Sequence, residues 1–204
     1  MGVNDKNGIL SKLHQMDDVT LELGCGSKKK IPHAIGVDAL DYDSVDIVGD
    51  VFDVLRAFPE QSINAVSSSH FFEHVADLSS LLDEIARVLK IGGRLEIVVP
   101  HFSNPYFFSD YTHRSFFGLY TLCYFASKSP FKRDVPTYQK VIRYEIARID
   151  LVFRSRRPFY VRMVFKKLLG VVFNMNDYMK ELYEENFCYM FPCYEIRYEM
   201  NRLP

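Results

Sequence analysis

The sequence has no long apolar run, no excess of positive charge and no closely paired cysteines. No run approaches the roughly 18 apolar residues that a membrane-spanning helix needs, so such a helix is not expected. The formal net charge of -1 argues against a globally basic nucleic-acid-binding protein, although a local basic patch is compatible with it. We therefore expect no nucleic-acid partner.

The N-terminal stretch also lacks targeting signals. Residues 1–18 are polar and do not show the charged, apolar and small regions of a secretory signal. Lys6 stands where a myristoylation signal needs Ser or Thr. None of the four cysteines forms a C-x-x-C pair, so we expect reduced thiols. These absences predict a cytoplasmic protein, with the inner face of a membrane as a second location.

What is present is typical of one globular domain. The chain has 204 residues, of which 48% are hydrophobic and 25% charged, and these values suit a single packed domain. We expect one domain over residues 1–204, with residues 1–18 as an N-terminal segment. Trp is absent, but Phe and Tyr are abundant, and many of them fall after residue 100.

Short β-rich runs separated by turns predict most of the secondary structure. The apolar positions of residues 78–89 recur at helical spacing, with Asp77 as a candidate N-cap. Predicted strands cover residues 19–24, 34–38, 45–48, 63–67, 95–99, 138–153 and 193–201. The early connections, 27–33 and 40–44, are too short to hold crossover helices.

This order predicts an α/β, Rossmann-like fold. We expect a mostly parallel seven-stranded sheet with an antiparallel C-terminal strand. The stretch between the last two strands, residues 154–192, is too long for a hairpin loop and predicts a helical insertion.

Three motifs at the ends of successive strands indicate an adenosine site. Gly24 and Gly26 straddle the end of the first strand, where glycine lets the backbone turn sharply and approach a ligand. Asp38 ends the second strand and can accept both hydroxyls of a ribose. Asp50 ends the third strand and can face the exocyclic amine of an adenine. Open α/β sheets bind ligands at this edge.

These residues resemble the motifs of class I S-adenosylmethionine-dependent methyltransferases. Glu22-Leu-Gly-Cys-Gly-Ser27, Gly36-Val-Asp38 and Gly49-Asp50-Val51 are similar to their first three motifs. Residues 63–74 and 84–100 resemble the fourth strand, helix and fifth strand of the type 11 (UbiE-like) branch. Residues 19–100 form the expected cofactor-binding core. The resemblance implies S-adenosyl-L-methionine as cofactor and methyl transfer to a small-molecule or carrier-linked acceptor, with a glycan among the candidates.

The predicted cofactor-binding residues are Glu22, Gly24, Cys25, Gly26, Asp38, Ala39, Asp50, Val51, Ser69 and His70. The sequence departs from the family pattern at Lys28, which replaces the third glycine of the first motif. An NAD site is the alternative, but Lys29 stands where its fingerprint needs glycine, and Asp38 comes too early.

A second pattern overlaps the end of the fourth strand. His70, Glu73 and His74 match the inverted zinc-peptidase motif H-x-x-E-H, which needs both histidines on one helix face and a third ligand. The motif begins directly after a strand, so we predict no metal site and keep a zinc hydrolase as a remote alternative. His74 is also compatible with a packing role at the start of a helix.

Residues 101–137 place polar groups among aromatic ones and predict an acceptor lid. Asp110, His113 and Arg114 resemble a D-x-x-H stretch that many members of this branch carry over the acceptor. The predicted catalytic residues are His113 as a base, Asp110 as the residue that orients it, and His70. The predicted substrate-binding residues are His74, His101, Tyr106 and Arg114. The alternative for Asp110 and His113 is a hydrogen bond that fixes a loop.

Residues 154–173 contain six basic residues and no acid. A helix here would place Arg162 and Lys166 on one narrow polar face, and it would suit an anionic membrane surface or a phosphate-bearing acceptor. The alternative is a core-packed helix or a homodimer contact with a solvated basic edge.

The sequence leaves one other function open, that of a non-catalytic module. Such a module would hold S-adenosylmethionine or nothing, while its aromatic C-terminal half contacts a partner. Convergence of His70, His113 and Arg114 near the sulfonium would favour the methyltransferase over this module.

Overall fold

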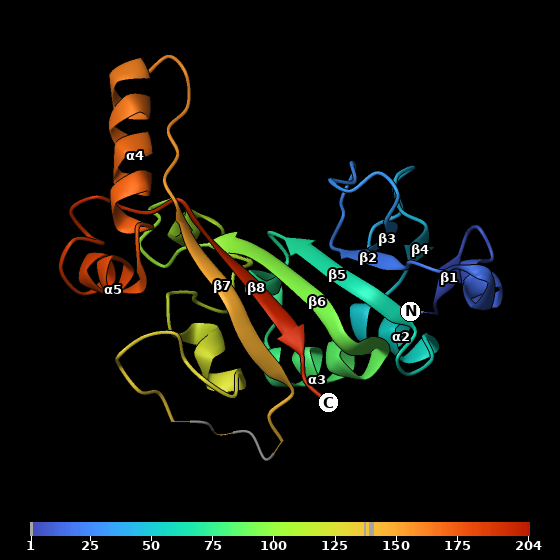
Figure 1. The fold of residues 1–204 in the computed structure, drawn as a ribbon. Helices are drawn as coiled ribbons and strands as arrows, with labels where there is room; N and C mark the ends of the chain where they lie inside the picture. The colour runs from blue at the N-terminus through green and yellow to red at the C-terminus, as the bar shows by residue number, and fades with distance from the viewer. Residues whose placement is uncertain (1, 137, 139–140) are drawn as a thin grey trace.

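The computed structural model describes residues 2–136, 138 and 141–204, and it is built on a mixed β-sheet (Figure 1). The strand order is β1-β4-β3-β2-β5-β6-β8-β7. The strands are β1 (Asn4–Asp5), β2 (Thr20–Leu23), β3 (Ile35–Asp38), β4 (Ile47–Val48), β5 (Ile63–Ser69), β6 (Leu89–Pro100), β7 (Tyr144–Val152) and β8 (Glu195–Arg202). Strands β4, β3, β2, β5 and β6 pair in parallel, whereas β8 is antiparallel to both β6 and β7.

This arrangement confirms the predicted Rossmann-like fold with its antiparallel C-terminal strand. The sheet has one strand more than the seven expected, because β1 from the N-terminal segment pairs antiparallel with β4. The connections from β2 to β3 and from β3 to β4 hold no helix, as their lengths predicted.

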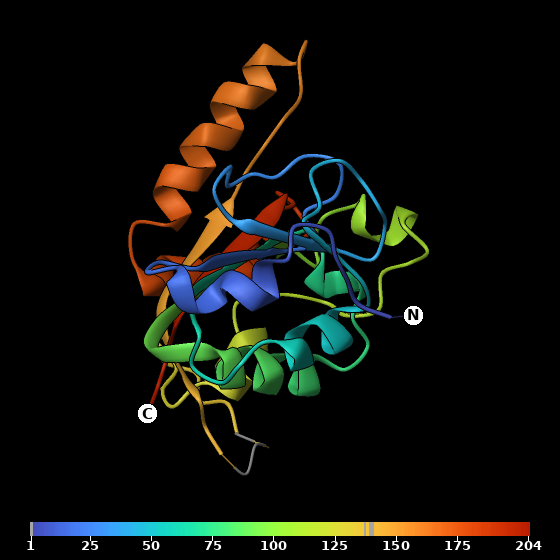
Figure 2. The same cartoon turned by 90° about the vertical axis from the view of Figure 1, so that its right-hand side faces the viewer.

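Helices α2 (Val51–Ala57) and α3 (Leu78–Val88) lie side by side on one face of the sheet (Figures 1 and 2). Asp77 accepts a hydrogen bond from the Ser80 amide and caps α3, as its sequence position predicted. Arg87 of α3 donates to the carbonyl oxygens of Leu55 and Phe58 and ties the two helices together. The sequence prediction missed α2, because seven residues carry too little periodicity to identify a helix.

Apart from the helices between β7 and β8, the other helical segments of the described residues are short. They are α1 (Ile9–Lys12), η1 (Leu13–Gln15), η2 (Phe72–His74), η3 (Phe107–Ser109) and η4 (Thr121–Phe125).

Phe117, Leu119 and Leu122 are fully buried, so the second half of the predicted lid packs into the core. The first half borders the site described below. Residue 137 of that lid, residues 139 and 140 of the strand predicted for 138–153, and residue 1 lie outside the described residues.

The predicted insertion between β7 and β8 contains helices α4 (Tyr160–Phe173) and α5 (Asp177–Asn186). Helix α4 stands out from the body of the molecule in both views (Figures 1 and 2). Only Leu169 and Phe173 of this helix are buried, so α4 is not the core-packed helix that formed one alternative. No helix in the described part of the chain combines the length and apolarity that crossing a bilayer requires.

Candidate functional site

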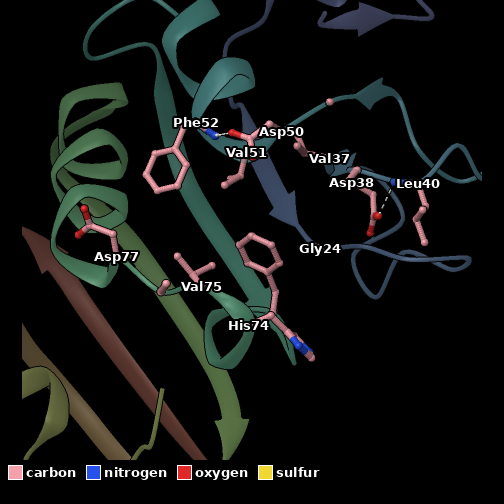
Figure 3. A pocket seen from close by; sticks show the side chains of 14 residues that line it. Gly24, Val37, Asp38, Leu40, Asp50, Val51, Phe52, His74, Val75 and Asp77 are labelled. Carbon is pink, nitrogen blue, oxygen red and sulfur yellow. Dashed lines mark hydrogen bonds between the residues drawn. The ribbon is translucent and has the colours of Figure 1, made fainter. Parts of the chain in front are cut away.

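A cavity of about 560 Å³ opens at the carboxyl ends of the central parallel strands (Figure 3). It is lined by Gly24, Val37, Asp38, Ala39, Leu40, Gly49, Asp50, Val51, Phe52, Phe71, His74, Val75, Ala76 and Asp77. Figure 3 shows Asp38 and Leu40 on one side of the cavity, with Val75 and Asp77 on the other. The structure therefore brings together the glycine loop and both strand-end aspartates that the sequence singled out.

The glycine loop is shaped by left-handed backbone at two positions. Gly24 has φ of 68° and Gly26 has φ of 60°, a region that favours glycine. A Cβ atom at Gly24 would lie 2.6 Å from the Cβ of Phe71, whereas one at Gly26 would meet nothing within 4 Å. Gly24 is thus required both by its dihedral angle and by the close approach of Phe71.

Asp38 and Asp50 are held in place by backbone amides. The Asp38 carboxylate accepts hydrogen bonds from the amides of Gly26 (2.8 Å) and Leu40 (2.9 Å), one on each oxygen. Asp50 accepts from the Phe52 amide at 2.9 Å and caps α2. A carboxylate oxygen can accept more than one hydrogen bond, so both groups keep acceptor capacity toward the cavity.

Several predicted cofactor residues shape the loop instead of lining the cavity. The buried Glu22 carboxylate accepts from the amides of Lys30 and Ile31 at 2.9 Å and fixes the path of the chain after the glycines. Cys25 is buried, and burial together with the nearby Asp38 raises the pKa of its thiol to about 11. Ser69, which also lies outside the lining residues, contacts the Lys30 ammonium.

His70 likewise lies outside the cavity lining and pairs with two carboxylates. Its Nε2 lies 2.9 Å from Glu195 Oε1, and its Nδ1 lies 3.4 Å from Glu73 Oε1. The hydrogen bonds to Glu195 and then Glu73 raise the pKa of His70 to about 9, so the ring is positively charged at neutral pH. Arg154 also approaches Glu195 Oε1, at 3.3 Å.

The predicted pair Asp110 and His113 is only loosely coupled. The Asp110 Oδ2 to His113 Nε2 distance is 3.7 Å, and Asp110 makes shorter bonds to Thr112. His113 Nδ1 donates to the Phe107 carbonyl at 2.8 Å, and its ring meets that of His74 at a centroid distance of 4.9 Å.

The other predicted substrate-binding residues are dispersed. His101 is fully buried, with one ring nitrogen 2.8 Å from Ser103 Oγ and the other 3.1 Å from Glu184 Oε2, so its ring does not reach the cavity. Tyr106 is exposed and lines a second cavity. The Arg114 amide donates to the Glu73 carbonyl at 2.6 Å, which places the chain at Arg114 beside the turn that follows β5.

The H-x-x-E-H stretch does not form the zinc-peptidase arrangement. His70 has φ of 58° and precedes η2, which covers only Phe72–His74. His70 and His74, the two histidines of this stretch, therefore do not share the face of one helix. Instead, His70, His113 and the chain at Arg114 converge on Glu73 and His74 at the rim of the cofactor-type cavity.

The second cavity, of about 650 Å³, lies between α4 and the end of β7. Its lining includes Tyr106 and the basic residues Arg154, Arg156, Arg157, Arg162 and Lys167. Arg154 and His70 share the Glu195 carboxylate, so this basic groove is connected to the histidine side of the first cavity.

Sequence reasoning missed Leu40, Phe52, Phe71 and Val75 as lining residues. Leu40 and Phe52 each lie two residues after a strand-end aspartate, and that spacing was an available signal. Phe71 and Val75 depend on the turn after β5, whose path follows the left-handed backbone of His70 and is not evident from sequence.

Comparisons with known proteins agree with this geometry. Residues 21–97 match the family model described as a methyltransferase domain, of type 11. No curated protein matches the sequence significantly. The chain shares its fold with a SAM-dependent methyltransferase from Archaeoglobus fulgidus (18% identity, TM-score 0.55, covering 95% of this chain and 92% of that one).

Two further solved structures have the same fold. The YcgJ protein from Bacillus subtilis has 14% identity and a TM-score of 0.53, with 95% of this chain and 97% of that one covered. Phosphoethanolamine N-methyltransferase 2 from Haemonchus contortus, in complex with phosphomonomethylethanolamine and S-adenosylhomocysteine, has 16% identity and a TM-score of 0.51. That alignment covers 97% of this chain and 52% of the other.

Proposed function

We propose that this chain, whose residues 21–97 match the type 11 methyltransferase family model, is a class I S-adenosyl-L-methionine-dependent methyltransferase. Its acceptor is a small-molecule or carrier-linked compound bound beside the cofactor cavity. The observation that carries the proposal is the convergence of Gly24, Asp38 and Asp50 on one cavity with a histidine cluster at its rim. A cavity of about 560 Å³ lies in the size range of cofactor sites.

The adenosine part is assigned to the strand-end aspartates. Asp38, whose oxygens are oriented by two backbone amides, accepts the ribose hydroxyls. The apolar side chains of Leu40 and Phe52 flank the adenine, and Asp50 receives its exocyclic amine. The methionine end then lies toward Gly24, with the loop fixed by Glu22 behind it.

The acceptor is assigned to the side formed by His74, Asp110, His113 and Arg114. Methyl transfer from a sulfonium is an in-line displacement, in which the enzyme mainly aligns donor and nucleophile and excludes water. His113 donates through Nδ1 to the Phe107 carbonyl, so its Nε2 carries the lone pair that is available to act on an acceptor. His70 contributes a positive charge next to this side.

The basic groove suits an acceptor with an anionic carrier. Arg156, Arg157 and Lys167 lie with Tyr106 in one cavity, and guanidinium groups bind phosphate in a bidentate manner. The shared contact of Arg154 and His70 with Glu195 would bring the acceptor end of such a molecule to the histidine side. A lipid- or nucleotide-linked glycan has this chemistry.

Calorimetric titration with S-adenosylmethionine and S-adenosylhomocysteine tests the cofactor site. We expect micromolar binding that weakens about 10- to 100-fold in Asp38→Asn, because charge-assisted hydrogen bonds contribute about 1.5–3 kcal/mol. Asp38→Ala should weaken binding further, and the exposed Asp17→Ala is the matched control that should leave it unchanged. If neither ligand binds the wild-type protein, the interaction-module alternative replaces the proposal.

A further inference from the structure

Three side chains at the rim of the cofactor cavity form a cluster with metal-binding chemistry. Glu73, His74 and His113 each offer one ligand atom, and these atoms lie within 4.8 Å of one another. The amides of Arg114 (2.6 Å) and Ser115 (3.1 Å) both donate to the Glu73 carbonyl, so the backbone itself holds the His113 loop against η2.

The hydrogen bonds of the two histidines assign their protons. His113 Nδ1 lies 2.8 Å from the Phe107 carbonyl, which can only accept, so Nδ1 carries the proton. Thr112 Oγ1 donates to Asp110 Oδ1 at 2.6 Å and therefore accepts from His74 Nδ1 at 2.9 Å. Both rings keep the Nε2 lone pair. Metal-binding histidines typically bind the ion through one ring nitrogen and donate a hydrogen bond through the other, as Nδ1 does in both of these rings.

Glu73 supplies an independent observation. Its side chain is 1% exposed, and its Oε2 is buried without a hydrogen-bond partner among the described residues. Leaving a buried acceptor unpaired costs about 1–3 kcal/mol, and more for a charged group. A cation bound between the two imidazoles and the Glu73 carboxylate would compensate the charge of this buried group.

We propose that Glu73, His74 and His113 bind a divalent transition-metal cation that holds the acceptor hydroxyl beside the cofactor. Two imidazoles and one carboxylate are a donor set that suits Zn²⁺, Mn²⁺ or Fe²⁺ and leaves coordination positions open. The location of the acceptor rests on the proposed function, and in this site His113 is a metal ligand instead of a base. The cluster differs from the H-x-x-E-H set, because His113 takes the place of His70.

The cation would lower the pKa of a bound acceptor hydroxyl, as metal ions do for bound water. The hydroxyl releases its proton to solvent, and its oxygen attacks the methyl carbon of the sulfonium. The new C–O bond forms as the C–S bond breaks, and the electron pair of that bond stays on sulfur as S-adenosylhomocysteine. The cation is unchanged, so the step yields the methyl ether and one proton.

The test is metal binding by the full chain in the absence of cofactor and acceptor. After chelator treatment and dialysis, wild-type protein is titrated calorimetrically with Zn²⁺ and Mn²⁺, and Co²⁺ loading is followed by its visible spectrum. We expect one equivalent to bind. Affinity should fall at least tenfold in Glu73→Gln and His113→Ala, while the exposed His33→Ala is the control that should match wild type.

Folding of each variant is checked by circular dichroism, and the near-isosteric Glu73→Gln keeps the test informative if His113→Ala unfolds. No stoichiometric binding by wild type, or binding that the Glu73 and His113 variants leave unchanged, overturns the proposal. A separate titration with S-adenosylhomocysteine reports on the proposed function, so that the two can fail independently.

Discussion

At the scale of single residues, the site depends on two kinds of position. At some, a neighbouring side chain leaves no room for a Cβ atom, and at others backbone amides hold a side chain in one orientation. Gly24 and Gly26 share a left-handed backbone, but only Gly24 lies under a neighbouring side chain, that of Phe71. Asp38 acts twice, because it fixes the Gly26 amide and also faces the cavity. Asp38 therefore links the geometry of the glycine loop to the lining of the cavity.

This contrast predicts different costs for two matched substitutions. Gly26→Ala should lower the free energy of unfolding by about 1–2 kcal/mol, the cost of a left-handed L-residue. Gly24→Ala should lower it by about 1–3 kcal/mol more, because its Cβ would also overlap the Phe71 side chain. Urea unfolding of both variants measures the difference, and equal losses would contradict the assigned contact.

At the scale of elements, α4 stands apart, because most of its side chains do not pack against the sheet. Its outward residues are apolar and highly exposed: Val161, Val164, Leu168 and Val171. The basic groove lies along the same helix, with the Arg162 guanidinium 4.4 Å from the centroid of the Phe159 ring. Apolar residues beside a basic groove are typical of helices that lie on anionic membrane surfaces.

Liposome flotation at low salt tests this element. We expect wild-type protein to float with anionic vesicles, and the double variant Val164→Asp/Leu168→Asp to remain behind without loss of folding, since both side chains are exposed. Arg156→Ala and Arg157→Ala should each weaken binding about fivefold, at about 1 kcal/mol per basic residue near the surface. If wild type does not float at low salt, the membrane interpretation is wrong, and a homodimer contact stays as the alternative for this face.

At the scale of the whole molecule, the candidate cofactor cavity is formed at the ends of β2, β3 and β4 and by the turn that follows β5. A ligand that occupies it should therefore stabilise the entire fold. At a concentration 100 times its dissociation constant, S-adenosylhomocysteine should add about 2.7 kcal/mol. This corresponds to a rise in Tm of about 5–10 °C for a chain of this length.

Thermal unfolding with increasing ligand measures this shift. Asp38→Asn should show a smaller shift at the same ligand concentration, and Asp17→Ala should match wild type. A Tm that does not respond to the ligand would mean that the folded protein does not bind S-adenosylhomocysteine, and this would contradict the proposed cofactor site.

The sequence by itself determined the fold class and the positions of seven of the described strands, and its motifs indicated the cofactor. Gly24, Asp38 and Asp50 lie at strand ends, and parallel strands bring their carboxyl ends to one edge, so local patterns sufficed to place these residues together. The N-cap of α3 and the helical insertion were likewise evident from local spacing. All of these signals act within a few residues.

The surroundings of the candidate histidines were decided by the tertiary structure alone. His70 meets Glu195, 125 residues further on, and His113 meets His74 across 39 positions, and no local pattern specifies such contacts. For His101, local position led to a wrong expectation. Its place directly after β6 suggested a substrate contact, yet its ring is buried between Ser103 and Glu184. Long-range packing sets these partners, because loops without periodicity take the path that the surrounding core allows.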